Sequence, residues 1–149
     1  MKKLFLASIA LTTFALSIGL FQMTSCKKAE AQVNNTNTTY PIEGLWIGTY
    51  TVDSQPALGE QYFALSIKPD STIVADTKWG TTQHLAPGSW SLSGNTFTCT
   101  YTCVYGLPNH IGIEEKITAT WSNTGTLIGT WENSPTPTGS GPVVFHRVN

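Results

Sequence analysis

The sequence predicts an all-β domain, a small antiparallel up-and-down barrel of about eight strands that occupies residues 42–149. Three observations predict it. Strand-length runs follow one another with turn residues between them and no helical stretch. Apolar and polar residues alternate along several of these runs, which is typical of strands with one buried face. Thr, Ser and Gly supply most of the polar residues, since only 11% of the chain is charged.

Turn residues delimit the expected strands. Gly, Pro, Asn, Asp and Ser favour turns, whereas β-branched and aromatic residues favour strands. The turn-rich segments are Pro69–Ser71, Ser93–Asn95, Gly106–Asn109, Asn123–Gly125 and 135–142. The strands expected between them are, in chain order, Leu45–Val52, Gln61–Lys68, Thr72–Thr77, Ser89–Ser93, Thr96–Tyr105, Ile111–Trp121, Thr126–Trp131 and Val143–Val148.

Two of these runs show the alternation most clearly. In Thr96–Tyr105, Thr occupies one face and the other face carries aromatic and Cys residues. In Ile111–Trp121, the face predicted to be buried carries Ile, Ala and Trp side chains, and the opposite face carries charged and Thr residues. Both patterns predict antiparallel strands with one solvent-exposed face and one buried face.

The first 26 residues have the layout of an export signal. A basic start, Lys2-Lys3, precedes an uncharged stretch over 4–23, and small residues stand directly before Cys26. This layout resembles the signal of bacterial lipoproteins, in which the Cys is acylated and becomes the first mature residue. The resemblance implies a signal peptide over 1–25 and lipidation at Cys26. The alternatives are a plain cleaved signal and a retained transmembrane helix, which Gly19 and the Ser/Thr residues of the stretch disfavour.

The same resemblance implies where the protein resides. Lys27 occupies the second mature position, where an Asp is associated with retention in the inner membrane, so the outer membrane is favoured, on either of its faces. Several acyl chains anchor a protein stably, because each buried methylene contributes about 0.8 kcal/mol. Residues 26–41 are polar and lack periodicity, which predicts a flexible tether after the lipidated Cys26. The membrane is therefore an expected partner.

Two short motifs stand near the ends of the expected barrel. Gly44-Leu45-Trp46 opens its first strand, and Arg147 lies in its last strand. The segment Gly125–Trp131 has the pattern Gly-x-Leu-x-Gly-x-Trp. These motifs resemble the calycin group, which includes lipocalins, fatty-acid-binding proteins and avidins. The resemblance implies a minimal lipocalin-like barrel whose base is closed by Gly44, Trp46 and Arg147, with the guanidinium against the indole ring.

Cys99 and Cys103 lie four residues apart on one expected strand. Their Cα atoms would be ~13 Å apart in an extended chain, whereas a disulfide requires less than about 7 Å. Two buried thiols are therefore the favoured interpretation. The alternative is a disulfide, which an oxidising compartment favours and which would require a bulge or a turn within the strand.

The chain carries no recognisable catalytic, metal-binding or cofactor-binding motif. His84, His110 and His146 are scattered, and none has a second His or a Cys two or four residues away. A phosphate-binding Gly loop, a Gly-x-Ser-x-Gly elbow and a basic patch are all missing. The sequence therefore predicts a protein that is not an enzyme, holds no metal or cofactor and does not bind nucleic acid. Convergence of the His residues on a zinc ion is the alternative.

Glu115 interrupts the apolar face of the run Ile111–Trp121, since strict alternation places its carboxyl group inward. A buried carboxylate requires partners or a raised pKa. The favoured interpretation is a bulge at Glu114-Glu115, which would turn both side chains to solvent, or a position of Glu115 at the rim of the barrel. An ion pair with Arg147 and a contact with the polar group of a ligand are the alternatives.

The functional prediction depends on whether the aromatic side chains fill the barrel or line a cavity. An eight-stranded barrel is just wide enough for side chains or one small ligand, and the number of large inward residues slightly favours a mostly filled interior. The first hypothesis is nevertheless a non-catalytic module that binds a small hydrophobic or amphipathic ligand. The contacts it assigns are Tyr101, Tyr105, Glu115, Trp121 and Trp131.

The second hypothesis is a filled barrel that acts as a protein-interaction or protease-inhibitor module, so that the partner is a protein. Its surfaces would be the loops Gln55–Glu60, Trp79–Pro87 and Pro135–Pro142, with Trp79 as an exposed anchor.

Overall fold

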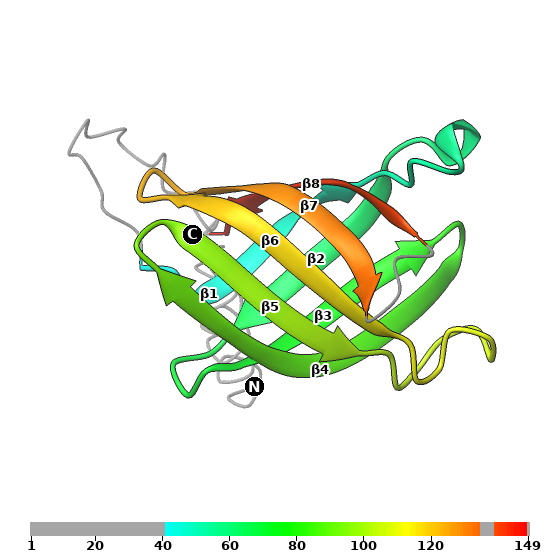
Figure 1. Ribbon diagram of the computed structural model, residues 1–149, viewed down its shortest axis with the longest axis horizontal. Coiled ribbons are helices and arrows are strands. Elements are labelled where there is room, and N and C mark those ends of the chain that lie inside the picture. The colour runs from blue at the N-terminus through cyan, green and yellow to red at the C-terminus, as the bar shows by residue number, and fades with distance from the viewer. Residues whose placement is uncertain (1–40, 135–138, 149) are drawn as a thin grey trace, which may run out of the picture. The chain divides into compact units, whose positions relative to one another are not determined.

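The computed structural model describes residues 41–134 and 139–148. Within these residues the chain forms a closed barrel of eight antiparallel strands, in which each strand pairs with the next and the last returns to the first (Figure 1). The prediction of an all-β up-and-down barrel of about eight strands is therefore confirmed. The elements are β1 (Gly44–Tyr50), η1 (Pro56–Leu58), β2 (Gln61–Ile67), β3 (Thr72–Trp79), β4 (Thr82–Ser93), β5 (Thr96–Thr102), β6 (Glu114–Ser122), β7 (Thr126–Ser134) and β8 (Ser140–Arg147).

The segments predicted to precede the barrel fall outside this description. The signal peptide predicted for 1–25, the lipidated Cys26 and nearly all of the tether predicted for 26–41 belong to residues that the structure does not describe. They stay predictions.

β4 is longer than the sequence indicates. It begins at Thr82 rather than at Ser89, because Pro87 and Gly88 continue the pairing with β3 instead of forming a turn. Pro lacks a backbone N–H, so a strand tolerates it only where that donor is not needed. The predicted loop Trp79–Pro87 is consequently wrong: most of it is the end of β3 and the start of β4.

β5 and β6 are shorter than the alternation predicts, ending at Thr102 and beginning at Glu114. The connection between them is held by its own hydrogen bonds, from Cys103 N to Ile113 O at 2.9 Å and from Gly112 N to Cys103 O at 2.8 Å. Gly112 has a φ of 85°, a conformation that favours glycine and interrupts extended backbone. Side chains in this connection therefore do not follow the alternation of the strands.

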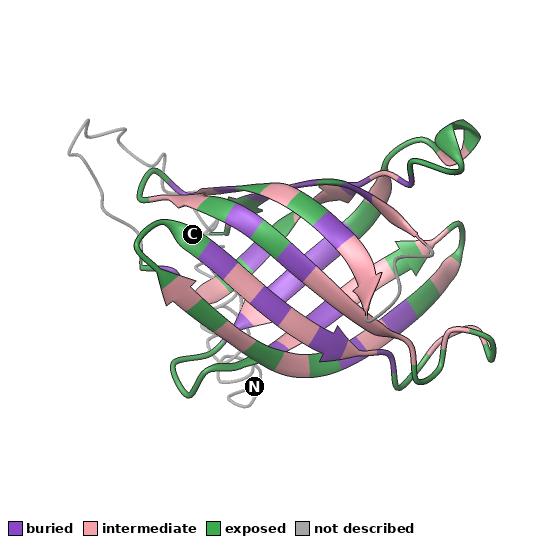
Figure 2. Cartoon of the chain, in the orientation of Figure 1, coloured by how far each residue is buried: buried purple, intermediate pink, exposed green. Residues whose placement is uncertain are grey.

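The two ends of the barrel differ in packing. We call the end with the β1–β2, β3–β4 and β5–β6 connections the mouth, and the opposite end the base. Buried and exposed residues alternate along the strands, as the bands in Figure 2 show. Large side chains fill the base, and each contributes about 1.5–3 kcal/mol through burial. Those that are 0% exposed are Trp46, Leu65, Phe97, Ile117, Leu127 and Phe145.

Trp46 lies at the base of the barrel, where Gly44 and Arg147 also lie. Its indole Nε1 donates a hydrogen bond to the carbonyl oxygen of Ile42 at 2.7 Å. Arg147 is its partner across β1 and β8, and Nη1 of Arg147 donates to the carbonyl oxygen of Pro41 at 3.2 Å. A Cβ atom at Gly44 would lie 2.8 Å from Nη2 of Arg147. The guanidinium therefore occupies the space that the missing side chain of Gly44 leaves.

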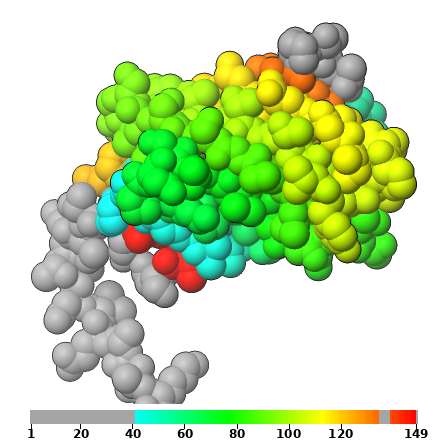
Figure 3. Space-filling model, turned by 90° about the horizontal axis from the view of Figure 1, so that it is seen from below, coloured from blue at the N-terminus to red at the C-terminus, as the bar shows by residue number. Residues whose placement is uncertain are grey.

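The outer wall of the barrel is continuous where it is seen in Figure 3, which shows the green segment that includes β3 and β4 from outside. The outward residues of β4 in this wall are polar: Ser89, Ser91 and Ser93 are all exposed. The sheet therefore encloses the interior on this side.

Candidate ligand cavity

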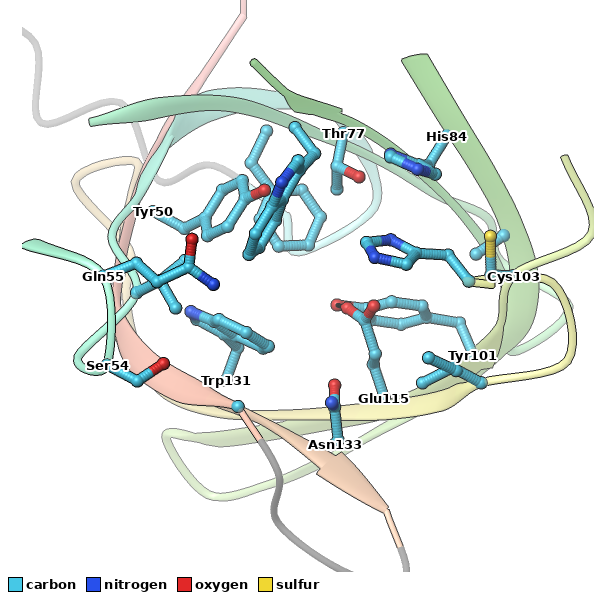
Figure 4. A pocket seen from close by; sticks show the side chains of 17 residues that line it. Tyr50, Ser54, Gln55, Thr77, His84, Tyr101, Cys103, Glu115, Trp131 and Asn133 are labelled. Atoms are coloured by element: carbon cyan, nitrogen blue, oxygen red, sulfur yellow. Dashed lines mark hydrogen bonds between the residues drawn. The ribbon is translucent and has the colours of Figure 1, made fainter. Parts of the chain in front are cut away.

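The mouth half of the barrel is hollow. A cavity of about 120 Å³ lies there, lined by residues from seven strands and from the β1–β2 and β5–β6 connections, and by Gly139 before β8. The labelled side chains ring a central space, with Tyr50 and Gln55 opposite Glu115 and Tyr101 (Figure 4). Ser54 and Gln55 at its rim are exposed. The prediction of a mostly filled barrel therefore holds for the base and fails at the mouth.

Glu115 is on the cavity wall, and the predicted bulge is wrong. The residue lies in regular β6 pairing, opposite Tyr101 on β5 and Asn133 on β7. Alternation therefore turns its side chain inward, as the sequence pattern indicates. The ion pair with Arg147 is excluded as well, because Arg147 lies at the base beside Trp46.

The carboxyl group of Glu115 has one hydrogen-bond partner among the described residues. The hydroxyl group of Tyr101 donates to Oε2 at 3.0 Å. Burial raises the pKa of Glu115, and this hydrogen bond opposes the rise. The pKa of Tyr101 is raised well above its usual value by burial and then by the nearby carboxylate, so the hydroxyl keeps its proton and remains a donor.

Aromatic rings form the opposite wall and are fixed by hydrogen bonds to the backbone. Trp131 donates from Nε1 to the carbonyl oxygen of Thr51 at 2.8 Å. The hydroxyl group of Tyr50 donates to the carbonyl oxygen of Lys78 at 2.9 Å. The Tyr50 and Trp131 rings meet edge to face, with centroids 5.5 Å apart. Since these polar atoms already have partners, the rings offer their carbon surface to the cavity.

Two histidines on the cavity wall stack on one another. The rings of His84 on β4 and His110 in the β5–β6 connection have centroids 4.8 Å apart at 22°. His110 also meets Trp79 edge to face at 5.5 Å. Burial lowers the pKa of His84, with a further contribution from His110, so neutral imidazole is favoured. Gly106 has a φ of 146°, and a Cβ atom there would lie 1.8 Å from Cδ2 of His84, so this position accepts only glycine.

The two thiols of the barrel are free and buried, as the strand geometry predicts. Burial raises the pKa of Cys99 to about 12. Burial also raises the pKa of Cys103, which lies on the cavity wall. A nucleophilic Cys requires the thiolate form. The surroundings of Cys99 and Cys103 both disfavour the thiolate, so neither residue is suited to act as a nucleophile.

Three of the five predicted contact residues lie on the cavity wall: Tyr101, Glu115 and Trp131. Tyr105 does not, because β5 ends before it and its side chain is 60% exposed. Trp121 does not either, since it pairs with Leu127 toward the base and packs against the core there.

The sequence interpretation missed several wall residues. His84 lies in the part of β4 that the sequence predicts as a loop, and His110 lies in a connection that the alternation does not describe. Tyr50 falls in a predicted strand, but no sequence signal distinguishes it from a core residue. Trp79 is partly buried against His110 rather than standing on a loop tip, so the anchor that the protein-interaction hypothesis assigns is wrong.

In 41–134 and 139–148, no group of three or more His, Cys, Asp or Glu side chains is placed to hold a metal ion. Nor does this part of the chain include a helix with the length and hydropathy needed to cross a membrane.

Comparison with known proteins supports the fold alone. No family model matches the chain, and no curated protein sequence matches it. Among the solved structures that are similar to the chain, two have 14% sequence identity each. The first is EF1p2_mFAP2b bound to DFHBI, with a TM-score of 0.54 over 71% of this chain and 93% of that one. The second is a redesigned β-barrel, mFAP1, bound to DFHBI, with a TM-score of 0.52 over 76% of this chain and 100% of that one. The chain therefore shares its barrel fold with ligand-bound β-barrels.

Proposed function

We propose that this barrel is a non-catalytic binding module that holds a small amphipathic molecule in its mouth. The observation that carries the proposal is the cavity of about 120 Å³, whose wall combines aromatic rings with the hydrogen-bonded pair of Glu115 and Tyr101. Small-molecule sites typically join an apolar lining to a few placed polar groups. The two similar structures add support, because each holds DFHBI.

The cavity volume limits the part of the ligand that enters it. An engineered apolar cavity of about 150 Å³ admits benzene, so a space of about 120 Å³ accommodates one small ring or a short chain. A larger ligand would leave its remainder at the mouth near Ser54 and Gln55, which are exposed. Its apolar part would pack against Trp131 and Phe63, with its polar part toward Glu115.

The indole N–H signals of the protein test this proposal. Trp79 and Trp131 line the cavity, whereas Trp46, Trp90 and Trp121 do not. In a nitrogen-15 NMR titration with benzyl alcohol and other benzene-sized compounds, the indole signals of Trp79 and Trp131 should shift. The indole signals of the other three Trp residues should not move. The three unshifted signals are the control, since they report any general change in the protein.

Two results would count against binding at the mouth. One is a titration in which no compound shifts the Trp79 or Trp131 signals. The other is a set of shifts of equal size at all five indoles, which would indicate non-specific association. Native mass spectrometry of the protein isolated gently from its host adds an independent measurement, because a bound molecule that is lost on denaturation would be a resident ligand.

We further propose that the module is held at the outer membrane by acylation of Cys26. The support is the sequence alone: the basic start, the uncharged stretch over 4–23 and the small residues before Cys26. Lys27 favours the outer rather than the inner membrane. The mature protein would carry more than one acyl chain, which is what stable anchoring requires.

Mass spectrometry of the amino-terminal peptide tests the anchor. The expected peptide begins at Cys26 and carries the added mass of acyl chains. Cys26→Ser should abolish both the acylation and membrane association, whereas Cys103→Ser, the matched control in the barrel, should leave them intact. An unmodified Cys26 in a mature protein, or a retained 1–25 segment, would contradict the proposal.

A further inference from the structure

Within 41–134 and 139–148, no cationic side chain pairs with the carboxyl group of Glu115. Among the described residues, no Lys or Arg forms an ion pair with Glu115. Its register neighbours are Tyr101 and Asn133, which carry no charge at neutral pH. Oε2 accepts the hydrogen bond from Tyr101, and within the described residues Oε1 accepts none. A buried carboxylate in this state gains stabilisation from any cation that reaches it.

The aromatic wall across the cavity from this carboxylate suits a cation better than an anion. The rings of Tyr50 and Trp131 have their polar atoms bonded to backbone carbonyls, at 2.9 Å and 2.8 Å. The faces of aromatic rings carry negative electrostatic potential and attract ammonium groups. An anionic ligand would meet both the carboxylate and these ring faces.

We propose that the ligand is a small organic cation, a protonated amine carried on a ring of about benzene size. Its ammonium group contacts Glu115 and its ring lies against Trp131 and Tyr50. This inference rests on the proposed function and names the ligand class for the same cavity. Glu115 is half-buried in the folded barrel, so folding rather than binding has already met part of the cost of desolvating its carboxylate.

The size of the cavity agrees with this class. The ring of such an amine is close to benzene, which an apolar cavity of about 150 Å³ admits. The space of about 120 Å³ therefore takes the ring, and the ammonium group stays beside the carboxylate on the wall. Gln55 and Ser54 at the rim are exposed and polar, so a short substituent can point to water.

Binding of the cation depends on pH through the groups that face the cavity. Protonation of Glu115 removes the negative charge, so affinity falls as the pH falls through the pKa of this residue. Protonation of His84 acts in the same direction, because an imidazolium group repels a cation; burial lowers the pKa of His84, so this contribution comes at a lower pH than for an ordinary His. Four other titratable groups near Glu115 have raised pKa values and stay protonated and neutral from neutral pH downward: Tyr50, Cys99, Tyr101 and Cys103.

Benzylamine and benzyl alcohol separate charge from shape. They have the same number of heavy atoms, but benzylamine is charged at neutral pH and the alcohol is not. Isothermal titration calorimetry at pH 7 should show that benzylamine binds about 10- to 100-fold more tightly, the range expected for a hydrogen bond to a charged group. Benzylamine affinity should fall on acidification, whereas that of benzyl alcohol should not.

Two Glu→Gln variants locate the charge that is responsible. Glu115→Gln keeps the shape and the acceptor for Tyr101 but removes the charge, so the preference for benzylamine should shrink to within about 2-fold. Glu132→Gln removes one charge from the outer surface, where Glu132 pairs with Lys116 at 3.9 Å. This matched variant should keep the full preference.

The outcomes that would overturn the inference differ from those that would overturn the proposed function. Equal affinity for the two probes, or tighter binding of benzyl alcohol, would refute the inference that the ligand is a cation. It would leave the proposal of ligand binding in place. A preference for benzylamine that persists in Glu115→Gln would also refute it. Absence of binding for both probes, with no shift of the Trp79 and Trp131 indole signals, would refute both proposals.

Discussion

At the scale of the residue, Glu115 is the position where stability and binding conflict. Burial raises the pKa of its carboxyl group, so the folded protein holds this proton more tightly than the unfolded chain does. The free energy of unfolding therefore falls as the pH rises from the ordinary carboxyl range through the raised pKa, and it stays lower above it. A residue that lowers stability in this way is typical of a binding site.

Glu115→Gln should accordingly stabilise the protein at pH 7. The neutral amide avoids the burial of a charge and still accepts the hydrogen bond from Tyr101. We expect the free energy of unfolding in urea to rise by about 0.5–2 kcal/mol, and the Glu115 contribution to the pH dependence to disappear. Glu132→Gln on the outer surface should change stability by less than about 0.5 kcal/mol. A loss of stability in Glu115→Gln would mean that the folded protein stabilises the charged carboxylate.

The thiol of Cys99 offers a second prediction for a single residue. Because burial raises its pKa to about 12, it carries almost no thiolate at pH 8 and should not react with iodoacetamide in the folded protein. After unfolding in urea it should react at the rate of an ordinary thiol. Peptide mass spectrometry after timed alkylation measures both rates. Rapid modification of Cys99 without urea would contradict its place in the core.

At the scale of the element, the sequence determined which strands exist better than where they begin and end. The period-2 alternation was reliable inside strands, and it placed the side chains of Tyr101 and Glu115 on the same face correctly. It failed at strand ends, because Tyr105 continues the pattern after β5 has stopped. Pro87-Gly88 has the composition of a turn and yet lies inside β4, since pairing with β3 outweighs local preference.

The candidate site was only partly predictable for the same reason. Its residues come from strand ends and connections at the mouth, where backbone hydrogen bonds rather than sequence period set the direction of a side chain. The bulge at Glu114-Glu115 was expected because a lone buried carboxylate is costly. The structure instead keeps the regular register and provides Tyr101 as the partner.

Trp46 provides the prediction at the level of β1. Its indole is 0% exposed and bonds the carbonyl oxygen of Ile42, so it fixes the chain segment that leads into the strand. Trp46→Ala should lower the free energy of unfolding by about 3–5 kcal/mol, the usual effect of removing a buried Trp side chain. Leu45→Ala on the same strand is the control. Leu45 is 44% exposed, so its loss should change stability by less than about 0.5 kcal/mol.

Urea unfolding followed by circular dichroism measures both variants of β1. An effect of Trp46→Ala no larger than that of Leu45→Ala would mean that the base is held closed without the indole ring.

At the scale of the whole molecule, the barrel divides into a filled base and a hollow mouth. The sequence could not decide between a filled and an open interior, because the number of large inward residues says nothing about the end at which they gather. The structure concentrates Trp46, Phe97 and Phe145 at the base. Smaller side chains, such as Thr77 and Ala86, face the cavity at the mouth.

This division predicts opposite effects for one substitution made at the two ends. Ala86→Leu adds apolar volume beside the cavity, so it should raise the free energy of unfolding by about 0.5–2 kcal/mol and abolish the shift of the Trp131 indole signal by benzyl alcohol. Ala119→Leu should destabilise by about 1–3 kcal/mol, as overpacking does. Ala119 is 4% exposed and belongs to the packed core. Equal destabilisation by the two variants, measured by urea unfolding, would show that the mouth is packed as tightly as the base and leaves no room for a ligand.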